Sequence, residues 1–323
     1  MKYEIAFQDN LTGEVWDLSP VVTKFSLASD RNGQPSKLEV ELISALKFPE
    51  GSPVTLKVMD PTYSKNLFYG YLFKVITKGN NRVTLTFYDQ RIYLKRTGSY
   101  VFTNQTLPAI VSAVAKDFEL KVGKLNAPNV KLPTILKEDK SALDIIQECM
   151  DQLLAQTGEY VVFWDEYGEL RLEYPEKLRI LNILGPGSIV SNFEHARSIE
   201  DSANTVKLSH DHDGQRTNYV FKDSNNVKKW GKLEYFTRVD EKLNAAQIKS
   251  MGEKLLKLRN KPKETLKIYL DVGNFDFESG RAVFVELPDV KVKGWFLIEK
   301  VTHQVNPASH TMDVELWMGD IPS

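Results

Sequence analysis

The sequence is poor in cysteine, in long apolar runs and in net charge, and each shortage excludes a class of protein. Cys149 is the only cysteine among 323 residues, which excludes an internal disulfide framework. The longest uncharged apolar stretch, 107–115, is far too short to span a bilayer, and residues 1–5 lack the apolar core of a signal peptide. No membrane anchor is expected.

The charge balance also argues against a protein that binds polyanions. The formal net charge is −1, whereas nucleic-acid-binding domains are usually strongly basic. Hydrophobic residues make up 42% and charged residues 26% of the chain, as in ordinary soluble globular proteins. We therefore expect two or three globular domains, no specific nucleic-acid binding, and folding in a reducing compartment.

One strand pattern occurs twice, once near each end of the chain. Four strand-like segments near the N-terminus follow one another at 37–43, 51–60, 70–77 and 83–88. Four near the C-terminus follow at 266–272, 280–289, 294–302 and 312–317. The second segment of each set runs from glycine to aspartate with the same spacing, Gly51 to Asp60 and Gly280 to Asp289. Because period-two alternation is typical of half-buried strands, the pattern predicts two similar β-domains and internal pseudo-symmetry.

The middle of the chain changes to a helical period. Thr106 is placed to cap a helix with a continuous apolar side, and Ser141 with Asp144 has the form of a capping box before a second helix. A hairpin at 160–174 follows. These elements predict an α+β insert between the two β-domains.

One further helix is expected near the C-terminal β-domain. Asn244 and Gln247 form a capping box, and the apolar stripe of this helix contains Ile248, Met251, Leu255 and Leu258. The fold class predicted is therefore α+β, mostly β, with two related tube-like β-barrel domains joined by an α+β insert. The expected ranges are 1–100 for the first barrel, 101–188 for the insert and 189–323 for the second barrel, with its helix at about 243–260.

Short segments spread along the chain share their order with one known family. They are 70–73 (Gly-Tyr-Leu-Phe), 87–95, the capped helix at 141–156 with the hairpin at 160–173, and 294–303 with 310–312. In this order, and at this chain length, they resemble the XkdQ family, the baseplate hub proteins of contractile phage tails and phage-like particles. The resemblance covers essentially the whole chain.

The resemblance implies a structural function without catalysis or cofactors. It implies a homotrimeric ring in the tail baseplate of a virion or phage-like injection particle, assembled in the bacterial host cytoplasm. The implied partners are the tail tube or tube-initiator proteins, the central spike protein and the tape measure protein in the lumen. Tail tubes are six-fold and spikes three-fold, so three chains with two barrels each would act as a symmetry adaptor.

Three aromatic residues are the candidate interface. Trp317 lies out of phase with the apolar residues of its strand, and Tyr88 and Tyr269 are similarly out of phase. Exposed aromatic side chains are enriched in protein interfaces. The alternative is that these rings lie under a neighbouring domain of the same chain.

A metal site and a catalytic site are the rival interpretations. His210 and His212, with Asp211 and Asp213, are close in sequence and could bind metal. A solvated hairpin tip is the preferred interpretation, because the remaining ligands of a calcium loop are missing, and no metal is expected. His303 and His310 are interpreted as structural histidines.

Nucleophilic catalysis has little support. The sequence has no Gly-x-Ser-x-Gly motif, and Cys149 lies beside a buried stripe, where cysteine behaves as a small hydrophobe. The alternative function is a tail-associated cell-wall hydrolase or carbohydrate-binding module. Convergence of His210, His212 and nearby acids on one pocket would favour it.

Overall fold

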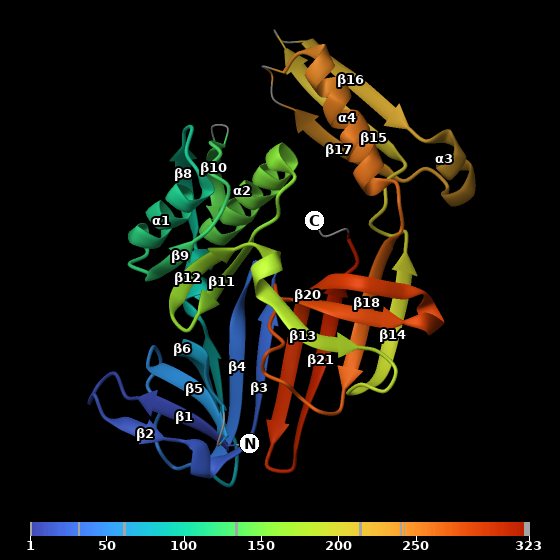
Figure 1. Ribbon diagram of the computed structural model, residues 1–323. Helices are drawn as coiled ribbons and strands as arrows, with labels where there is room; N and C mark the ends of the chain where they lie inside the picture. The colour runs from blue at the N-terminus through green and yellow to red at the C-terminus, as the bar shows by residue number, and fades with distance from the viewer. Residues whose placement is uncertain are drawn as a thin grey trace. The chain divides into compact units, whose positions relative to one another are not determined.

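The computed structural model describes residues 2–31, 33–60, 63–132, 135–212, 215–239, 241 and 243–319. The chain is α+β and mostly β (Figure 1). It divides into two compact units, of which unit 1 contains Met1–Glu194 with Lys267–Ser323, and unit 2 contains His195–Leu266. The two units are described separately.

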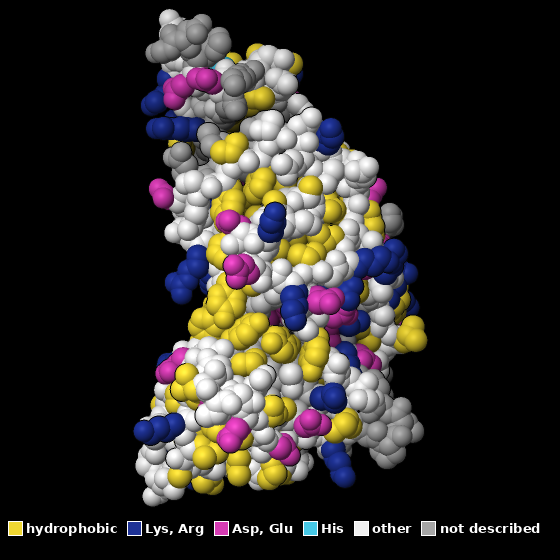
Figure 2. Space-filling view, turned by 90° about the vertical axis from the view of Figure 1, so that its left-hand side faces the viewer, with side chains coloured by type: hydrophobic (Ala, Val, Ile, Leu, Met, Phe, Trp, Pro, Cys, Tyr) yellow, Lys and Arg dark blue, Asp and Glu magenta, His cyan; other side chains and the backbone are white. Residues whose placement is uncertain are grey.

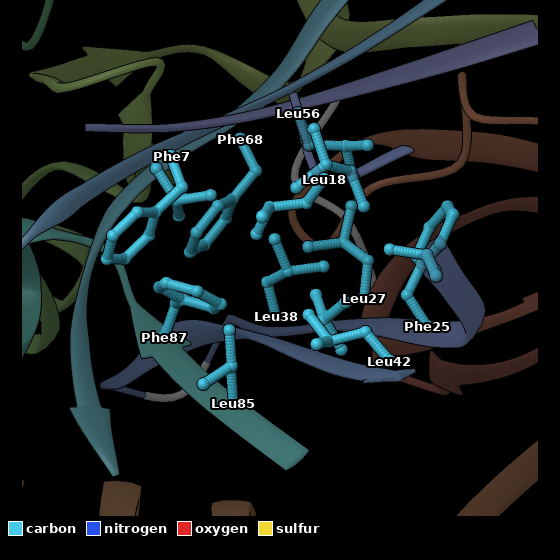
Figure 3. Packing of buried hydrophobic residues seen from close by; sticks show 14 of the residues in the cluster. Phe7, Leu18, Phe25, Leu27, Leu38, Leu42, Leu56, Phe68, Leu85 and Phe87 are labelled. Carbon is cyan, nitrogen blue, oxygen red and sulfur yellow. The ribbon is translucent and has the colours of Figure 1, made fainter. Parts of the chain in front are cut away.

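The first strand set of unit 1, repeat 1, begins with β1 (Lys2–Gln8) and β2 (Val15–Asp17). It continues with β3 (Val22–Asp30), β4 (Gln34–Ile43), β5 (Pro53–Asp60), β6 (Tyr63–Thr77) and β7 (Arg82–Tyr88). Neighbouring strands follow the order β3-β4-β7-β6-β5-β1-β2. Alternate residues of these strands point into one apolar core, where Phe7, Leu38, Leu56, Leu85 and Phe87 are fully buried (Figure 3).

The second strand set, repeat 2, contains β13 (Arg179–Leu184), β14 (Val190–Ser198), β18 (Lys263–Leu270), β19 (Ala282–Leu287), β20 (Val292–Asn306) and β21 (Ser309–Trp317). Neighbouring strands follow the order β14-β18-β21-β20, with β19 beside β20 and β13 beside β19. The order β3-β4-β7-β6-β5-β1 therefore recurs as β14-β18-β21-β20-β19-β13, so the two segments predicted to be similar do share one strand order.

The repeats differ at their outer strands. β1 pairs antiparallel with β5, whereas β13 pairs parallel with β19. In addition, β2 pairs with β1 and extends repeat 1 by one strand.

The two repeats form one continuous sheet. β3 pairs antiparallel with β20, and the pairing runs from Asp30 beside Lys300 to Phe25 beside Val305 (Figure 1). All strands of the two repeats belong to a 13-stranded sheet. Strand pairing among the described residues closes neither repeat into a barrel.

The α+β insert follows η2 (Gln90–Lys95). It contains β8 (Thr97–Phe102), α1 (Leu107–Asp117), β9 (Val122–Leu125), β10 (Ile135–Ser141), α2 (Ala142–Thr157), β11 (Val162–Glu166) and β12 (Glu169–Glu173), and ends before η3 (Pro175–Leu178). The side chain of Thr106 accepts a hydrogen bond from the N–H of Ala109, and that of Ser141 accepts one from the N–H of Asp144, as predicted. The two helices bury their apolar sides in a core of their own, which contains Cys149.

Unit 2 is a small sheet with a helix packed on it. β15 (Thr205–His212) lies between β16 (Gln215–Lys222) and β17 (Glu234–Val239), α3 (Ser224–Trp230) connects the last two, and α4 (Ala245–Arg259) follows. Asn244 and Gln247 form the predicted capping box. Residues 195–266, which the sequence analysis included in the second β-domain, thus form a compact unit of their own.

The predicted buried stripe of α4 is only partly right. Ile248 is fully buried, but Leu258 is 64% exposed and Met251 is 36% exposed. A three-stranded sheet covers less of a helix than a full domain core does, so the end of the stripe stays in solvent. None of the helices in the described part of the chain is long and apolar enough to cross a membrane.

Candidate functional site

The equivalence of the two repeats extends to single backbone hydrogen bonds. The N–H of Gly51 donates to the carbonyl of Leu72 at 2.7 Å, and the N–H of Gly280 donates to the carbonyl of Ile298 at 2.8 Å. Both glycines have positive φ, 80° and 83°, which glycine adopts without steric cost. The register with the next strand shifts directly after Leu72 and directly after Ile298. Leu72 and Ile298 therefore occupy the same position, and each long strand bulges just after it.

The side of the joined sheet that faces away from the core is here called the polar face. Along β18, β21, β20, β3, β4 and β7 it carries Lys267 and Tyr269; Thr311, Asp313 and Glu315; Lys300, Thr302 and Gln304; Lys24, Ser26 and Ala28; Lys37, Glu39 and Glu41; Thr84, Thr86 and Tyr88. Hydroxyl, amide and paired charged groups thus replace the apolar residues of the opposite face.

Opposite charges on the polar face neutralise one another locally. The amino group of Lys24 lies 3.0 Å from the carboxylate of Glu41, and that of Lys267 lies 3.3 Å from Asp313. Three hollows of about 300, 270 and 180 Å³ lie along this face. On the side of the molecule in Figure 2, basic and acidic side chains are likewise interspersed around apolar ones. Among the described residues, charges of both signs are therefore mixed on this face.

All three candidate interface residues lie on the polar face. Tyr88 is the cross-strand partner of Tyr71, and Trp317 is that of Leu297, so Tyr88 and Trp317 occupy equivalent positions in the two repeats. Tyr88, Trp317 and Tyr269 are half-buried. The phase predicted for Trp317, opposite to the buried apolar residues of β21, is confirmed, whereas an interface with a partner stays a prediction.

The surroundings of the three rings differ. Trp317 stacks on Tyr160 of the insert with ring centroids 5.8 Å apart, and the Arg31 guanidinium lies 5.2 Å from the Trp317 ring. Part of the Trp317 ring is therefore covered by other segments of the same chain, which is the alternative given above for these aromatics. Tyr88 packs edge-on against Phe73. The Tyr269 hydroxyl lies 3.4 Å from the carboxylate of Glu194.

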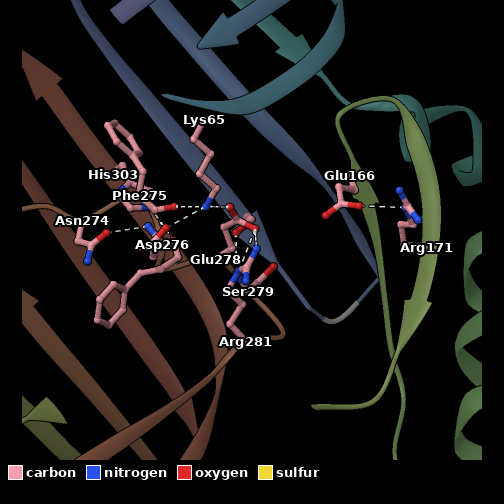
Figure 4. Close-up of polar contacts among 12 residues, drawn as sticks. Lys65, Glu166, Arg171, Asn274, Phe275, Asp276, Glu278, Ser279, Arg281 and His303 are labelled. Atoms are coloured by element: carbon pink, nitrogen blue, oxygen red, sulfur yellow. Dashed lines mark hydrogen bonds and ion pairs between the residues drawn. The ribbon is translucent and has the colours of Figure 1, made fainter. Parts of the chain in front are cut away.

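A loop of repeat 2 fastens the two repeats to each other. The amino group of Lys65 in β6 lies 2.6 Å from the carboxylate of Glu278 and donates to the carbonyl of Phe275 at 2.8 Å (Figure 4). The N–H of Ser279 donates to the hydroxyl of Ser29 in β3 at 3.0 Å. Phe275 also belongs to the repeat 1 core. The two repeats therefore share both polar and apolar contacts.

Two histidines lie beside this loop. Nε2 of His303 lies 2.8 Å from the carbonyl of Phe277, and Nδ1 of His303 lies 3.1 Å from Nε2 of His310. Since a carbonyl only accepts, His303 donates from Nε2, and His310 donates to its Nδ1. Burial lowers the pKa of each histidine to about 4. Both are neutral at pH 7, and these internal contacts support their interpretation as structural histidines.

A second buried cluster connects repeat 1 to the insert. The guanidinium of Arg91 donates to the carboxylate of Asp89 at 2.8 Å, and both side chains are 2% exposed. Gln90 donates to Asp165 of β11 at 2.6 Å. Burial, and then the charge of Asp89, raise the pKa of Asp165 to about 7. Sequence reasoning missed this cluster, because Asp89 to Arg91 follow a strand directly and resemble a solvated turn.

The cavity at this cluster is too small for a substrate. Its volume is about 50 Å³, which is room for one or a few water molecules, whereas ligand pockets typically measure about 300 Å³ or more. A perturbed carboxyl group is a common feature of catalytic sites, but here it faces only protein groups and a water-sized space. The contacts support a structural function for Asp165.

The histidine-rich hairpin of unit 2 does not assemble a metal site in the described part of the chain. His210 is buried, and its Nε2 donates to the carbonyl of Glu241 at 3.0 Å. The side chain of His212 and residues 213–214 lie outside the described residues. Among the residues described, no group of three or more His, Cys, Asp or Glu could hold a metal ion.

Comparison with known proteins identifies relatives over almost the whole chain. The model of a family described as YQBQ-like matches residues 25–317. The uncharacterized protein YqbQ of Bacillus subtilis is 27% identical over 307 residues, which is 93% of each chain. The phage-like element PBSX protein XkdQ of the same organism is 26% identical over 308 residues, again 93% of each.

A solved structure shares the fold at low identity. The 43 kDa tail protein of prophage MuSo2 from Shewanella oneidensis matches with a TM-score of 0.70, 14% identity and 98% coverage of both chains.

Proposed function

Because this chain belongs to the YQBQ-like family, we propose that it is a structural protein of a phage or phage-like tail, and in particular the baseplate hub. Its similarity to the PBSX protein XkdQ over 93% of both chains supports the tail assignment. The fold shared with a prophage tail protein points the same way. The buried carboxylates and histidines, engaged in internal contacts, favour assembly over catalysis.

The observation that carries the hub proposal is the repeated strand order within one continuous sheet. Three copies of the chain in a closed ring present six repeats. Such a ring has three-fold symmetry in its chains and approximate six-fold symmetry in its repeats. It can therefore join a six-fold tail tube to a three-fold spike. Each repeat then acts as a tube-like domain whose sheet is completed by its neighbours in the ring. Cyclic closure requires a head-to-tail interface between unlike surfaces.

The two ends of each repeat suit different partners. The turn between β6 and β7 and the turn between β20 and β21 are equivalent and occur six times in a trimer, so we assign them to the tail tube or its initiator. The insert occurs once per chain. Its Tyr167 packs against Tyr69, and its Tyr160 packs against Trp317. Its end of the ring is therefore three-fold, and we assign it to the spike.

The polar face is proposed to line the channel. Its paired charges hold a passing polyanion or tape measure protein only weakly, which suits transport. Tyr88, Tyr269 and the exposed part of Trp317 lie on this face and are the proposed interface residues for a partner of the ring. The resulting location is the tail baseplate of a virion or phage-like particle, after assembly in the host cytoplasm.

The proposal is tested by the mass of the purified protein over a range of concentrations, alone and with its tube and spike partners. Multi-angle light scattering should give three times 36.9 kDa. Electron micrographs should then show rings with six lobes at one end and three-fold features at the other. A chain that stays monomeric with both partners present would refute the hub, and cell-wall hydrolysis would have to be assayed instead.

A further inference from the structure

The long strand β20 uses one edge twice. Its first half pairs with β19, from Val292 to Leu297. Its second half, from Lys300 to Val305, pairs with β3 on the same side. The bulge after Ile298 separates the two halves. One strand edge therefore connects both the interior of repeat 2 and the junction with repeat 1.

The equivalent edge of β6 is paired only in its first half. β6 pairs with β5 as far as Tyr71, and the bulge follows Leu72. Within the described chain, no strand pairs with the β5 side of β6 beyond that point. Residues 74–77 are thus the counterpart of the β20 segment that pairs with β3, but they lack the partner.

Backbone direction identifies the groups left open. The N–H of Lys78 donates to the carbonyl of Arg82 in β7 at 2.7 Å. Because successive residues of a strand direct their N–H and carbonyl groups to opposite edges, those of Val75 and Thr77 point away from β7. In β20, the carbonyl of Glu299 accepts from the N–H of Arg31 at the end of β3 at 2.9 Å, which fixes the odd-numbered residues as those facing β3.

Burial at matching positions shows the effect of the missing strand. Val75 is the cross-strand partner of Leu85, and Val301 that of Val314, so the two valines are equivalent. Val301 is 1% exposed, whereas Val75 is only partly buried. Two residues further on, His303 is 1% exposed and its counterpart Thr77 is exposed. The backbone position is shared, but in repeat 2 β3 lies alongside the strand, and the loop with Phe275 and Phe277 also packs on His303.

The pairing of β3 with β20 is here called the β3–β20 joint. The strand of repeat 2 that is equivalent to β3 is β14. β14 stands beside β18 as β3 stands beside β4, at the end of the sheet order. Among the described residues β14 pairs with β18 alone, so its outer edge is open. The outer edge of β3, in contrast, is taken up by β20. An unpaired strand edge is a template for another chain.

We propose that β14 of one copy of this chain adds antiparallel to the edge of β6 at Val75 and Thr77 in the next copy, repeating between copies the β3–β20 joint found within the chain. The partner is a second copy, since the described part of each chain contains one open edge of each of these two kinds, and the two are related as the edges already joined within the chain. The contact is head-to-tail, as ring closure requires. This inference rests on the proposed hub function and specifies its interface.

The test is residue-level hydrogen–deuterium exchange on monomeric and trimeric fractions of the full chain, separated by mass. The amides of Val75 and Thr77 should exchange roughly a hundredfold more slowly in the trimer. The amide of Ile76, which faces β7, should change little and serves as an internal control. Slowed exchange in β14 should accompany the change in β6.

A matched pair of variants tests the same joint without exchange data. Thr77→Pro removes the N–H that faces the open edge, whereas Thr77→Val retains it. Thr77→Pro should weaken trimerisation roughly tenfold or more at each interface, and Thr77→Val should trimerise like the wild type. If Thr77→Pro fails to fold, the exchange experiment on the wild type decides.

The outcomes separate this inference from the hub proposal. A trimer in which Val75 and Thr77 exchange as in the monomer overturns the β14–β6 joint but leaves the ring. A Thr77→Pro chain that trimerises as well as Thr77→Val overturns the joint in the same way. A protein that remains monomeric at every concentration and with its tube and spike partners overturns both.

Discussion

Repeat 1 and repeat 2 share a strand order but not their surroundings. The β3–β4 connection in repeat 1 contains only residues 31–33, whereas the corresponding connection in repeat 2, from β14 to β18, contains unit 2. The second half of β20 is covered by β3, whereas no strand in the described part of the chain pairs with the corresponding edge of β6. The comparison teaches that the repeated strands determine topology, while neighbouring elements determine how deeply each position is buried.

The largest expected difference in stability between the repeats lies at their C-terminal ends, after Tyr88 and after Trp317. Tyr88 is followed by Asp89, which pairs with Arg91 at 2% exposure, whereas Trp317 is followed by the half-buried Met318. Asp89→Asn leaves the Arg91 charge buried without its partner and should lower the free energy of unfolding by about 3 to 5 kcal/mol. Urea titration measures this loss.

A matched control for Asp89 is the exposed pair on the polar face. Glu41→Gln breaks the contact with Lys24, whose side chain is 59% exposed, and should cost below about 1 kcal/mol. If Asp89→Asn and Glu41→Gln lower the free energy of unfolding equally, the buried pair at the end of repeat 1 contributes no more than an exposed pair does.

The histidine pair makes the stability of repeat 2 depend on pH. Thr77, the counterpart of His303 in repeat 1, does not titrate. The fold lowers the pKa of His303 from its ordinary value of 6.5 to about 4, so the unfolded chain binds more protons between these values. Stability is therefore complete above about pH 6.5 and falls as the pH drops toward 4. At about 1.4 kcal/mol per pKa unit, the loss at His303 is on the order of 3 kcal/mol.

Asp165 changes stability in the opposite direction and has to be removed from the measurement. Its pKa is raised from 3.8 to about 7, so its contribution is complete below about pH 3.8 and is lost as the pH rises through 7. In an Asp165→Asn background, chemical unfolding at several pH values should show a shallower slope for His303→Gln than for His303. Identical slopes would contradict the assigned burial of the neutral histidine.

The equivalent valines test the comparison most directly. Val301→Ala removes two methyl groups from a side chain that is 1% exposed and should cost about 2 to 3 kcal/mol. Val75→Ala should cost roughly half as much in the monomer, because Val75 is only partly buried there. Thermal and urea unfolding of both variants measures the ratio, and equal costs in the monomer would mean that the open edge does not affect burial.

The smallest expected effect concerns equivalent lysines. Lys300 lies 3.8 Å from Asp30 across the β3–β20 joint. Lys74 occupies the same position in repeat 1 and forms no ion pair with the described residues. Lys300→Gln should cost a few tenths of a kcal/mol and at most about 1 kcal/mol, and Lys74→Gln should cost nothing measurable. A double-mutant cycle with Asp30→Asn isolates the pair energy, and a zero coupling would remove this ion pair from the joint.

Local patterns in the sequence predicted much of the fold. The alternating segments and the spacing from Gly51 to Asp60 revealed the repeat, because period two and a positive-φ glycine are local requirements. The caps at Ser141 and Asn244 located two helices for the same reason. The phase of Trp317 placed it on the polar face.

The rest depends on contacts between distant segments. The β3–β20 pairing joins residues far apart in sequence, and alternation does not say which strand will lie alongside. The separation of unit 2 was missed because its strands have the same period as those of repeat 2. Asp89 and Arg91 were missed because burial of a charged pair depends on the insert that covers them.

The bulge found after Leu72 and again after Ile298 has a consequence for the dimensions of an assembly. A bulge bends its strand and increases the local twist, so each repeat bends at this equivalent position. If six such bends add up around a ring, they set its circumference and hence the width of what passes through. Deleting Phe73 or Glu299, the residues at the bulge, would straighten the strand, and a flatter arc no longer closes on itself at the same number of subunits.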